Sequence, residues 1–505
     1  MAPIRDQDVE FERIDFTALE PVCVVAQSLD NQWVPRRLLA RMLKKGRSLE
    51  DVDEKRQEFV RAEYLRALVN ARQVVVNRAY LYNNPAVFRD YEKPGPGRDA
   101  FEELLGSRVV VPFLFNEPAP HHVPSYTTDA AGFAGWLEVC REVKVPCLRL
   151  SWDDAENVAY IVEQLAGRFG DFAQSINRLD VSALGRELEL DPDRQRGLKA
   201  RLTEVSHRCV DLSGSDERIT REGLYKEFVV ADGTDPAEGK YDAGKPFAGE
   251  IKQLLDLDYN VNLPDALRRF PLTPADALHR TALQEWRPAT QDQRELSPDE
   301  LLTILKNVAF DLVQGAAFIK SLGALSLPEI VQLRGTWEWR RYVDAVEGLV
   351  ADPLTFVEGG AAEVYGSYVA LAETATRMAA EAKRQELSER WIPRVEVVVE
   401  VAGAVLSVLW GDRTEVKVAG EVSKAIGEKP AAVIVRLVVR GLTERGSRAE
   451  LSTSVDFMRG RFDRAQSQWD ELVRALSKTR GFEQLEGRAR ERRTANIDYS
   501  EELYR

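Results

Sequence analysis

Residues 73–77 read QVVVN, and residues 108–115 read RVVVPFLF. Continuous apolar runs of this length, rich in valine, are typical of strands that are buried on both faces of a parallel sheet. Residues 146–150 (PCLRL) are a third strand candidate and follow a helical pattern at 129–143. Because strands alternate with helices over residues 73–185, we expect a small α/β unit with a few, mainly parallel strands.

The chain on either side of this unit shows mainly helical patterns. Residues 34–45 and 49–70 place apolar side chains at helical spacing, and the same spacing recurs after residue 190. Ser297, Pro298 and Glu300 predict a capped helix start, and long helices are expected at 328–350 and 361–390. The predicted fold class is α+β and predominantly helical, with the small N-terminal α/β unit followed by a large helical region.

We expect four parts along the 505 residues. They are an N-terminal helical segment with a basic helix (1–72), the α/β unit (73–185), a helical region with a long loop at 231–247 (186–295), and a C-terminal helical domain with apolar runs at 395–410 and 431–439 (296–505). A loop as long as 231–247 is typical of functional or mobile segments.

Composition indicates the compartment. A net charge of −13 argues against a generally basic nucleic-acid coat protein, although one local basic face stays compatible with it. Four cysteines argue against a disulfide scaffold and favour a reducing compartment. The first residues lack an apolar secretory segment, and the run at 395–410 contains Glu396 and Glu400 and is too short to span a bilayer. We expect a soluble, cytoplasmic, multidomain protein without a membrane span.

The common catalytic signatures do not occur in the sequence. It contains no phosphate-binding G-x-x-x-x-G-K-[ST] loop, no G-x-S-x-G elbow and no H-E-x-x-H pair, which argues against P-loop enzymes, α/β-hydrolases and zincins. Cys140, Cys147, His207 and Cys209 lack the close spacing of structural zinc sites. We therefore predict no metal site and no cofactor from these motifs.

One alternative starts from the α/β unit. A strand that ends at Asn77, a helix, and a strand that leads to Glu117 are similar to the layout of PIN-like ribonucleases. The resemblance implies a cluster of carboxylates around a divalent metal ion for phosphodiester hydrolysis. Glu117 matches that pattern, with Asp171 and Asp180 as later catalytic acids, but Asn77 stands where the family has its first aspartate. The alternative is therefore a metal-dependent PIN-like nuclease, or a degenerate relative, built on residues 73–185.

A basic segment suggests a different function. Residues 33–47 contain six basic residues and no acid: Arg36, Arg37, Arg41, Lys44, Lys45 and Arg47. Such a helix can bind nucleic-acid phosphates, an anionic membrane or an acidic partner. The other interpretation is a solvated face that pairs with the acidic residues at 50–54.

Aromatic and basic residues also cluster on a predicted helix. Trp337, Trp339, Arg340 and Arg341 are either an interface anchor or the filling of a domain seam. Since the catalytic signatures are missing, we favour an interaction or scaffold protein that has a protein partner and contacts nucleic acid or another polyanion. The second alternative to an interaction protein is an enzyme with an unrecognised site near the loop at 231–247 and residues 225–227.

Overall fold

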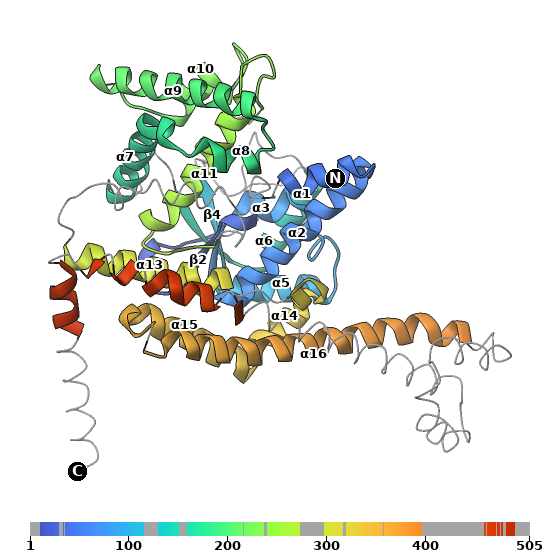
Figure 1. Ribbon diagram of the computed structural model, residues 1–505. Coiled ribbons are helices and arrows are strands. Elements are labelled where there is room, and N and C mark those ends of the chain that lie inside the picture. The colour runs from blue at the N-terminus through green and yellow to red at the C-terminus, as the bar shows by residue number, and fades with distance from the viewer. Residues whose placement is uncertain are drawn as a thin grey trace, which may run out of the picture.

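The computed structural model describes most of the chain up to residue 395 and a helical portion near the C-terminus (Figure 1). The described residues are 11–29, 34, 36–115, 130–150, 159–215, 217–236, 240–272, 297–316, 320–356, 358–395, 459–460, 462–470, 472–474, 476–477 and 481–489.

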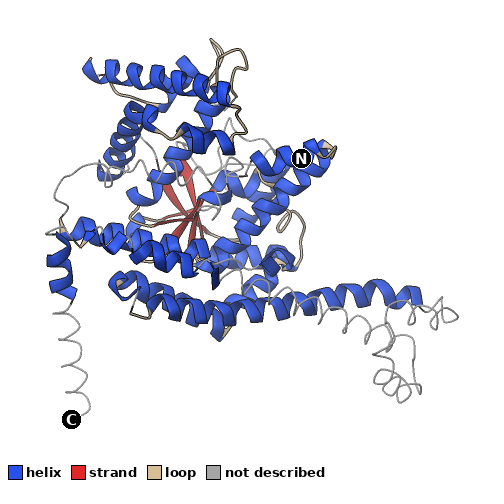
Figure 2. Ribbon diagram, in the orientation of Figure 1, coloured by secondary structure: helices blue, strands red, loops and turns tan. Residues whose placement is uncertain are grey.

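A parallel sheet lies at the centre of the molecule (Figure 2). Within the described residues it has six strands in the order β1-β5-β4-β3-β2-β6. The strands are β1 (Phe11–Arg13), β2 (Cys23–Ala26), β3 (Gln73–Asn77), β4 (Val110–Phe115), β5 (Val145–Leu150) and β6 (Phe270–Leu272). Every adjacent pair is parallel, so the carboxyl ends of all strands meet at one edge.

The order in which the chain adds strands to the sheet reverses at β2. From β2 the chain moves stepwise to β3, β4 and β5, and the later strand β6 pairs on the other side of β2. The helices of the stepwise part are α1 (Arg36–Lys44), α2 (Leu49–Asn70), α3 (Arg78–Tyr82), α4 (Pro85–Phe88), α5 (Pro96–Gly106) and α6 (Ala130–Glu142). Helix α2 begins with a capping box between Ser48 and Asp51.

A helical lobe connects β5 to β6 and lies above the sheet in Figure 1. It consists of α7 (Ala159–Ser175), α8 (Val181–Glu187), α9 (Pro192–Gly214), α10 (Arg221–Phe228) and α11 (Ala248–Ala266). The lobe has an apolar core of its own, which includes Phe172, Leu202 and Ile251. Helix α11 leaves this core and packs on the sheet through Leu263 and Leu267, beside Val25 of β2.

The C-terminal helices cover the opposite end of the molecule (Figure 1). They are α13 (Pro298–Ala316), α14 (Leu327–Arg334), α15 (Trp337–Ala351) and α16 (Gly360–Val395), with the short turns η8 (Lys320–Ala324) and η9 (Pro353–Phe356). Their apolar residues belong to the same core cluster as α2 and the alternate residues Val24 and Val74 of the sheet. Trp469, in the helical residues 462–470, stacks on Phe356 at 4.7 Å.

A buried arginine connects these helices to α2. The last carbonyls of a helix have no partner within it and need donors from elsewhere. Arg334, at the end of α14, donates to the carbonyls of Leu68, Ala71 (2.8 Å) and Arg72 (2.6 Å). The indole nitrogen of Trp339 donates to Val69 O at 2.8 Å. The C-terminus of α2 is therefore capped by side chains from α14 and α15.

The structure confirms the predicted fold class, with a mainly helical chain and a small parallel sheet near the N-terminus. The two valine-rich runs form β3 and β4, and the strand candidate at 146–150 forms β5. The sequence pattern did not predict β1, β2 or β6, because three or four residues are too few to show a strand period. The sheet thus takes strands from three of the four predicted parts, and the four-part division stays a prediction.

The helix expected at 328–350 is two helices. The helical structure is interrupted at Gly335 and Thr336. The Thr336 hydroxyl accepts a hydrogen bond from Trp339 N at 3.2 Å and so caps the start of α15. Apart from Val395, the apolar runs at 395–410 and 431–439 lie outside the described residues. Of the helices described, none is long and apolar enough to cross a membrane.

We expect Arg334→Met to lower the free energy of unfolding by about 2–4 kcal/mol, because three carbonyls, two of them in buried hydrogen bonds, lose a charged donor. Urea denaturation followed by circular dichroism measures the change. The control is Arg340→Met on the exposed side of α15, which should change stability by less than about 0.5 kcal/mol. Equal stability of the two variants would contradict a capping role for Arg334.

Candidate functional site

The structure describes two of the three predicted nuclease acids, Asp171 and Asp180, so the predicted cluster stays untested. Glu117 lies in 116–129, outside the described residues. Asp171 lies on α7, where the loss of hydration raises the pKa of its carboxyl and the charge of Arg168 opposes this shift. Asp180 is exposed and accepts a hydrogen bond from Ser182 N at 2.8 Å, at the start of α8. Among the described residues, no three His, Cys, Asp or Glu side chains are grouped to hold a metal ion.

The cysteines are free and buried. Burial raises the pKa of the Cys23 and Cys209 thiols to about 12, so both are protonated at neutral pH. A thiol is a poor nucleophile and a poor metal ligand compared with the thiolate. These side chains therefore act as small apolar residues of the core.

The region around Tyr225 holds a buried charge network. Asp256 of α11 accepts from Arg221 Nε at 2.8 Å, from Lys252 Nζ at 2.7 Å and from the Tyr225 hydroxyl. Burial alone would raise the pKa of Asp256, but the charges of Arg221 and Lys252 and these hydrogen bonds hold it below its usual range. The network joins α10 to α11 inside the lobe, which is a structural role.

The basic segment forms α1 and the turn that follows it. Lys44 pairs with Glu189 of the lobe at 2.9 Å, while Lys45 and Arg47 are exposed. All residues at 43–50 are exposed. The side chains of Arg36, Arg37 and Arg41 lie outside the description. The turn between α1 and α2, residues 43–50, is thus accessible and basic, and we call it the basic tip. One of its lysines, Lys44, forms an ion pair with the helical lobe.

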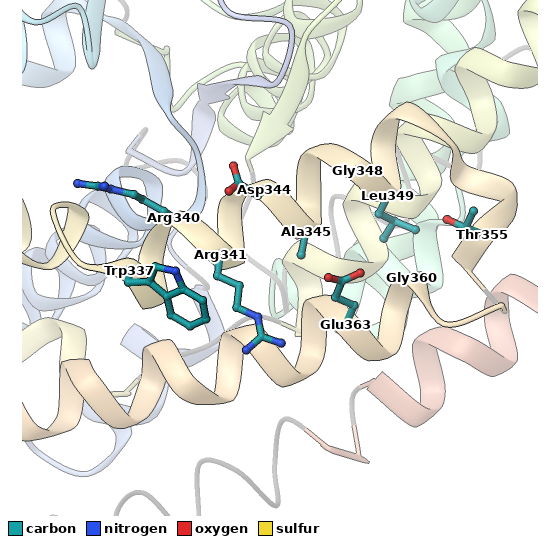
Figure 3. Close-up of a pocket in the computed structure, with 10 residues that line it drawn as sticks. All are labelled: Trp337, Arg340, Arg341, Asp344, Ala345, Gly348, Leu349, Thr355, Gly360 and Glu363. Atoms are coloured by element: carbon teal, nitrogen blue, oxygen red, sulfur yellow. The ribbon is translucent and has the colours of Figure 1, made fainter. Parts of the chain in front are cut away.

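A groove lies between α15 and α16, which form a helical hairpin (Figure 3). Its volume is about 480 Å³. It is lined by Trp337, Arg340, Arg341, Asp344, Ala345, Gly348, Leu349, Thr355, Gly360 and Glu363. The buried side of α15, with Trp339 and Tyr342, faces the core, and the groove is on the other side.

Small residues give the groove its depth. Ala345 and Gly348 of α15 and Gly360 at the start of α16 leave space between the two helices. A Cβ at Gly360 would lie 2.9 Å from Thr355 Oγ1 and 3.0 Å from Leu349 Cδ1, so glycine is needed there. Gly359 has a φ of +128°, which glycine adopts without strain. This Gly-Gly pair allows α16 to begin close against η9.

The side chains of the groove divide into two groups. In Figure 3, Trp337 and Arg341 point from α15 toward α16, whereas Arg340 and Asp344 point away. The Arg341 guanidinium lies over the Trp337 ring at 5.3 Å. Asp344 pairs with Arg72, which also donates to Glu347 at 2.6 Å. Trp337, Arg341 and Glu363 therefore form the accessible polar and aromatic surface of the groove.

Sequence reasoning found one wall of this groove. It singled out Trp337, Arg340 and Arg341, and the structure places all three at the groove, while Trp339 fills a seam against α2. It missed the opposite wall with Gly360 and Glu363. The available signal was the pair Gly359-Gly360 before a helical run, which indicates a tight helix start.

No protein-family model, curated protein or solved structure matches the chain.

We expect Asp256→Asn to lower the free energy of unfolding at pH 7 by about 3–5 kcal/mol, because Arg221 and Lys252 lose the carboxylate with which both of them pair. The folded pKa of Asp256 is below its unfolded value of about 3.9, so its contribution is complete above that pH and is lost as the pH falls through the folded pKa. The difference between wild type and variant should therefore shrink on acidification below about pH 4.

Urea denaturation at a series of pH values measures this difference. Asp232→Asn is the matched control, because Asp232 is an exposed carboxylate of the same lobe. If the difference in the free energy of unfolding stays constant from pH 7 to pH 2, the ionisation of Asp256 does not contribute to the pH dependence of stability.

Proposed function

We propose that this protein is an interaction protein and that the groove between α15 and α16 binds a segment of a partner protein. The observation that carries the proposal is Trp337, which is 65% exposed at the edge of a groove of about 480 Å³. Tryptophan and arginine are the residue types that most often dominate the binding energy of interfaces.

The groove is supported by rigid structure. Trp339, two residues after Trp337 and on the opposite face of α15, donates to Val69 O of α2, and Tyr342 donates to Asn70 Oδ1 at 3.2 Å. The Arg341 guanidinium over the Trp337 ring restricts both side chains before a partner binds. A partner therefore meets a surface that needs little ordering, which favours affinity.

The charges indicate the chemistry of the partner. Within the described residues, Arg340 and Arg341 have no ion pair, and Arg340 donates only to Gly335 O at 3.3 Å. The carboxylate of Asp344 is already paired with Arg72. The end of the groove around Trp337 is therefore open to negative charge. A segment with an acidic residue beside an apolar or aromatic one fits both Arg341 and the Trp337 ring.

Selection from a displayed library of random peptides tests this function. Peptides with an acidic residue beside an apolar one should be enriched on the native protein. Their affinity, measured by fluorescence anisotropy, should fall roughly 10- to 30-fold for Trp337→Ala and for Arg341→Glu. The control is Tyr241→Ala, which removes an exposed aromatic ring that does not line the groove and should leave binding unchanged. Peptides that bind Trp337→Ala and the native protein equally would contradict the proposal.

We propose a second binding function for the basic tip at 43–50, which contacts a polyanion such as nucleic acid. It is supported by the exposure of every residue of this turn, including the basic residues Lys45 and Arg47. The nuclease alternative and the alternative of an unrecognised enzyme have no such supporting observation, and they stay predictions from the sequence.

Salt-dependent binding to a short labelled DNA or RNA checks the polyanion contact. Double substitution of Lys45 and Arg47 by glutamate should weaken binding and reduce the slope of log K against log salt by about 1–2. Lys55→Glu on α2 is the control at a lysine that already pairs with Glu58. Binding without salt dependence, or with the same slope in the double variant, would rule out the tip as the contact.

A further inference from the structure

Two exposed leucines lie among the positive charges of the basic tip. Leu43, in the last turn of α1, is 47% exposed, and Leu49, the first residue of α2, is 77% exposed. In the part of the chain that the structure describes, five large hydrophobic side chains are exposed, and two of them belong to these eight residues. Single exposed leucines are common on protein surfaces, whereas apolar side chains grouped at one place indicate an interaction surface.

The turn that carries the leucines is held by hydrogen bonds at both of its ends. Gly46 has a φ of +74° and ends α1 in a Schellman motif. Its own N–H donates to Leu43 O at 2.9 Å, and Arg47 N donates to Met42 O at 3.1 Å. The next N–H, that of Ser48, donates within the capping box of α2. Because these backbone donors already have acceptors, the turn can enter an apolar medium without leaving them unsatisfied.

Positive charge outweighs negative charge in the basic tip. Its eight residues hold three basic side chains, of which Lys44 pairs with the lobe, and one acid, Glu50. Among the acids that follow, Asp51 is engaged in the capping box, and Asp53 forms an ion pair with an arginine of α2. Glu54 is exposed, but it lies five residues, about 7.5 Å, beyond the start of α2. The turn therefore presents positive charge and apolar surface together.

The leucines distinguish between two kinds of polyanion. A nucleic acid would bind the basic side chains through its phosphates, but it would leave both leucines in water. The tip also has no aromatic side chain on which a base could stack. A membrane with anionic lipids binds basic side chains at its headgroups and takes up apolar side chains at the boundary with the acyl chains. Both kinds of side chain in the tip then contribute to binding.

We propose that the basic tip binds a membrane surface that contains anionic phospholipids. Leu43 and Leu49 enter the boundary between headgroups and acyl chains, and the charges of Lys45 and Arg47 lie at the lipid phosphates. Because only two leucines enter the membrane, binding is reversible. This inference rests on the proposed contact of the tip with a polyanion and names that polyanion. It is independent of the groove between α15 and α16.

Sedimentation of the full chain with lipid vesicles tests the inference. The vesicles consist of phosphatidylcholine alone or with roughly one third phosphatidylserine, and the chain should bind only the second kind. Leu43→Ser combined with Leu49→Ser keeps the charge of the tip but removes its apolar surface, so it should weaken binding to these vesicles at least about tenfold. The matched control is Val210→Ser on α9, where the valine is 52% exposed outside the tip, and it should bind like wild type.

Binding to a labelled DNA or RNA separates this inference from the function on which it rests. Equal vesicle binding by wild type and the double leucine variant overturns the membrane contact. Salt-dependent binding of nucleic acid through Lys45 and Arg47, without binding to anionic vesicles, also overturns it but leaves the polyanion contact intact. If the chain binds neither vesicles nor nucleic acid, the polyanion contact is wrong as well.

The double leucine variant should fold, because both side chains are exposed, and circular dichroism checks this. If it does not fold, Leu49→Ser alone decides, since Leu49 is the more exposed of the two leucines. This single variant should bind anionic vesicles several-fold more weakly than wild type. Unchanged vesicle binding by folded Leu49→Ser overturns the membrane contact.

Discussion

The buried guanidinium of Arg334 at the C-terminus of α2 is the interaction on which the arrangement of the chain depends. Helix α2 covers the sheet and ends directly before β3, so its last carbonyls lie in the core with no partner of their own. Arg334 donates three hydrogen bonds there, to the carbonyl of Leu68 in the last turn and to those of Ala71 and Arg72 just after it. Because the donor is charged and buried, the helices that carry it must keep their position to avoid an uncompensated charge.

This constraint determines which face of α15 meets solvent. Trp339 and Tyr342 turn toward α2, where they bond to Val69 O and to Asn70. With a period of 3.6 residues, Trp337 and Arg341 must then lie on the opposite face, toward α16. Arg72, the residue after the α2 C-cap, forms ion pairs with Asp344 and Glu347, and these pairs join α15 to the end of α2. The groove is thus a consequence of the way in which α2 is capped.

The sequence predicts the parts of this architecture that have a period or a long run. The valine runs predict β3 and β4, the short segment 146–150 predicts β5, and the apolar spacing predicts α2. The strands β1, β2 and β6 are three or four residues long, and only pairing with neighbours distant in sequence stabilises them. For the same reason Trp337 and Arg341 are recognisable as interface residues, whereas Gly360 and Glu363 face them only after α16 folds back.

The two surfaces proposed for binding adjoin opposite ends of α2. The basic tip at 43–50 leads into the first turn of this helix, whereas Arg334 and Trp339 bind its last turn and so support the groove between α15 and α16. Because α2 has 22 residues, its two ends are about 33 Å apart. The C-terminal half of α2 is packed in the main apolar core, so any energetic coupling between the two surfaces would pass through a helix that has little freedom to move.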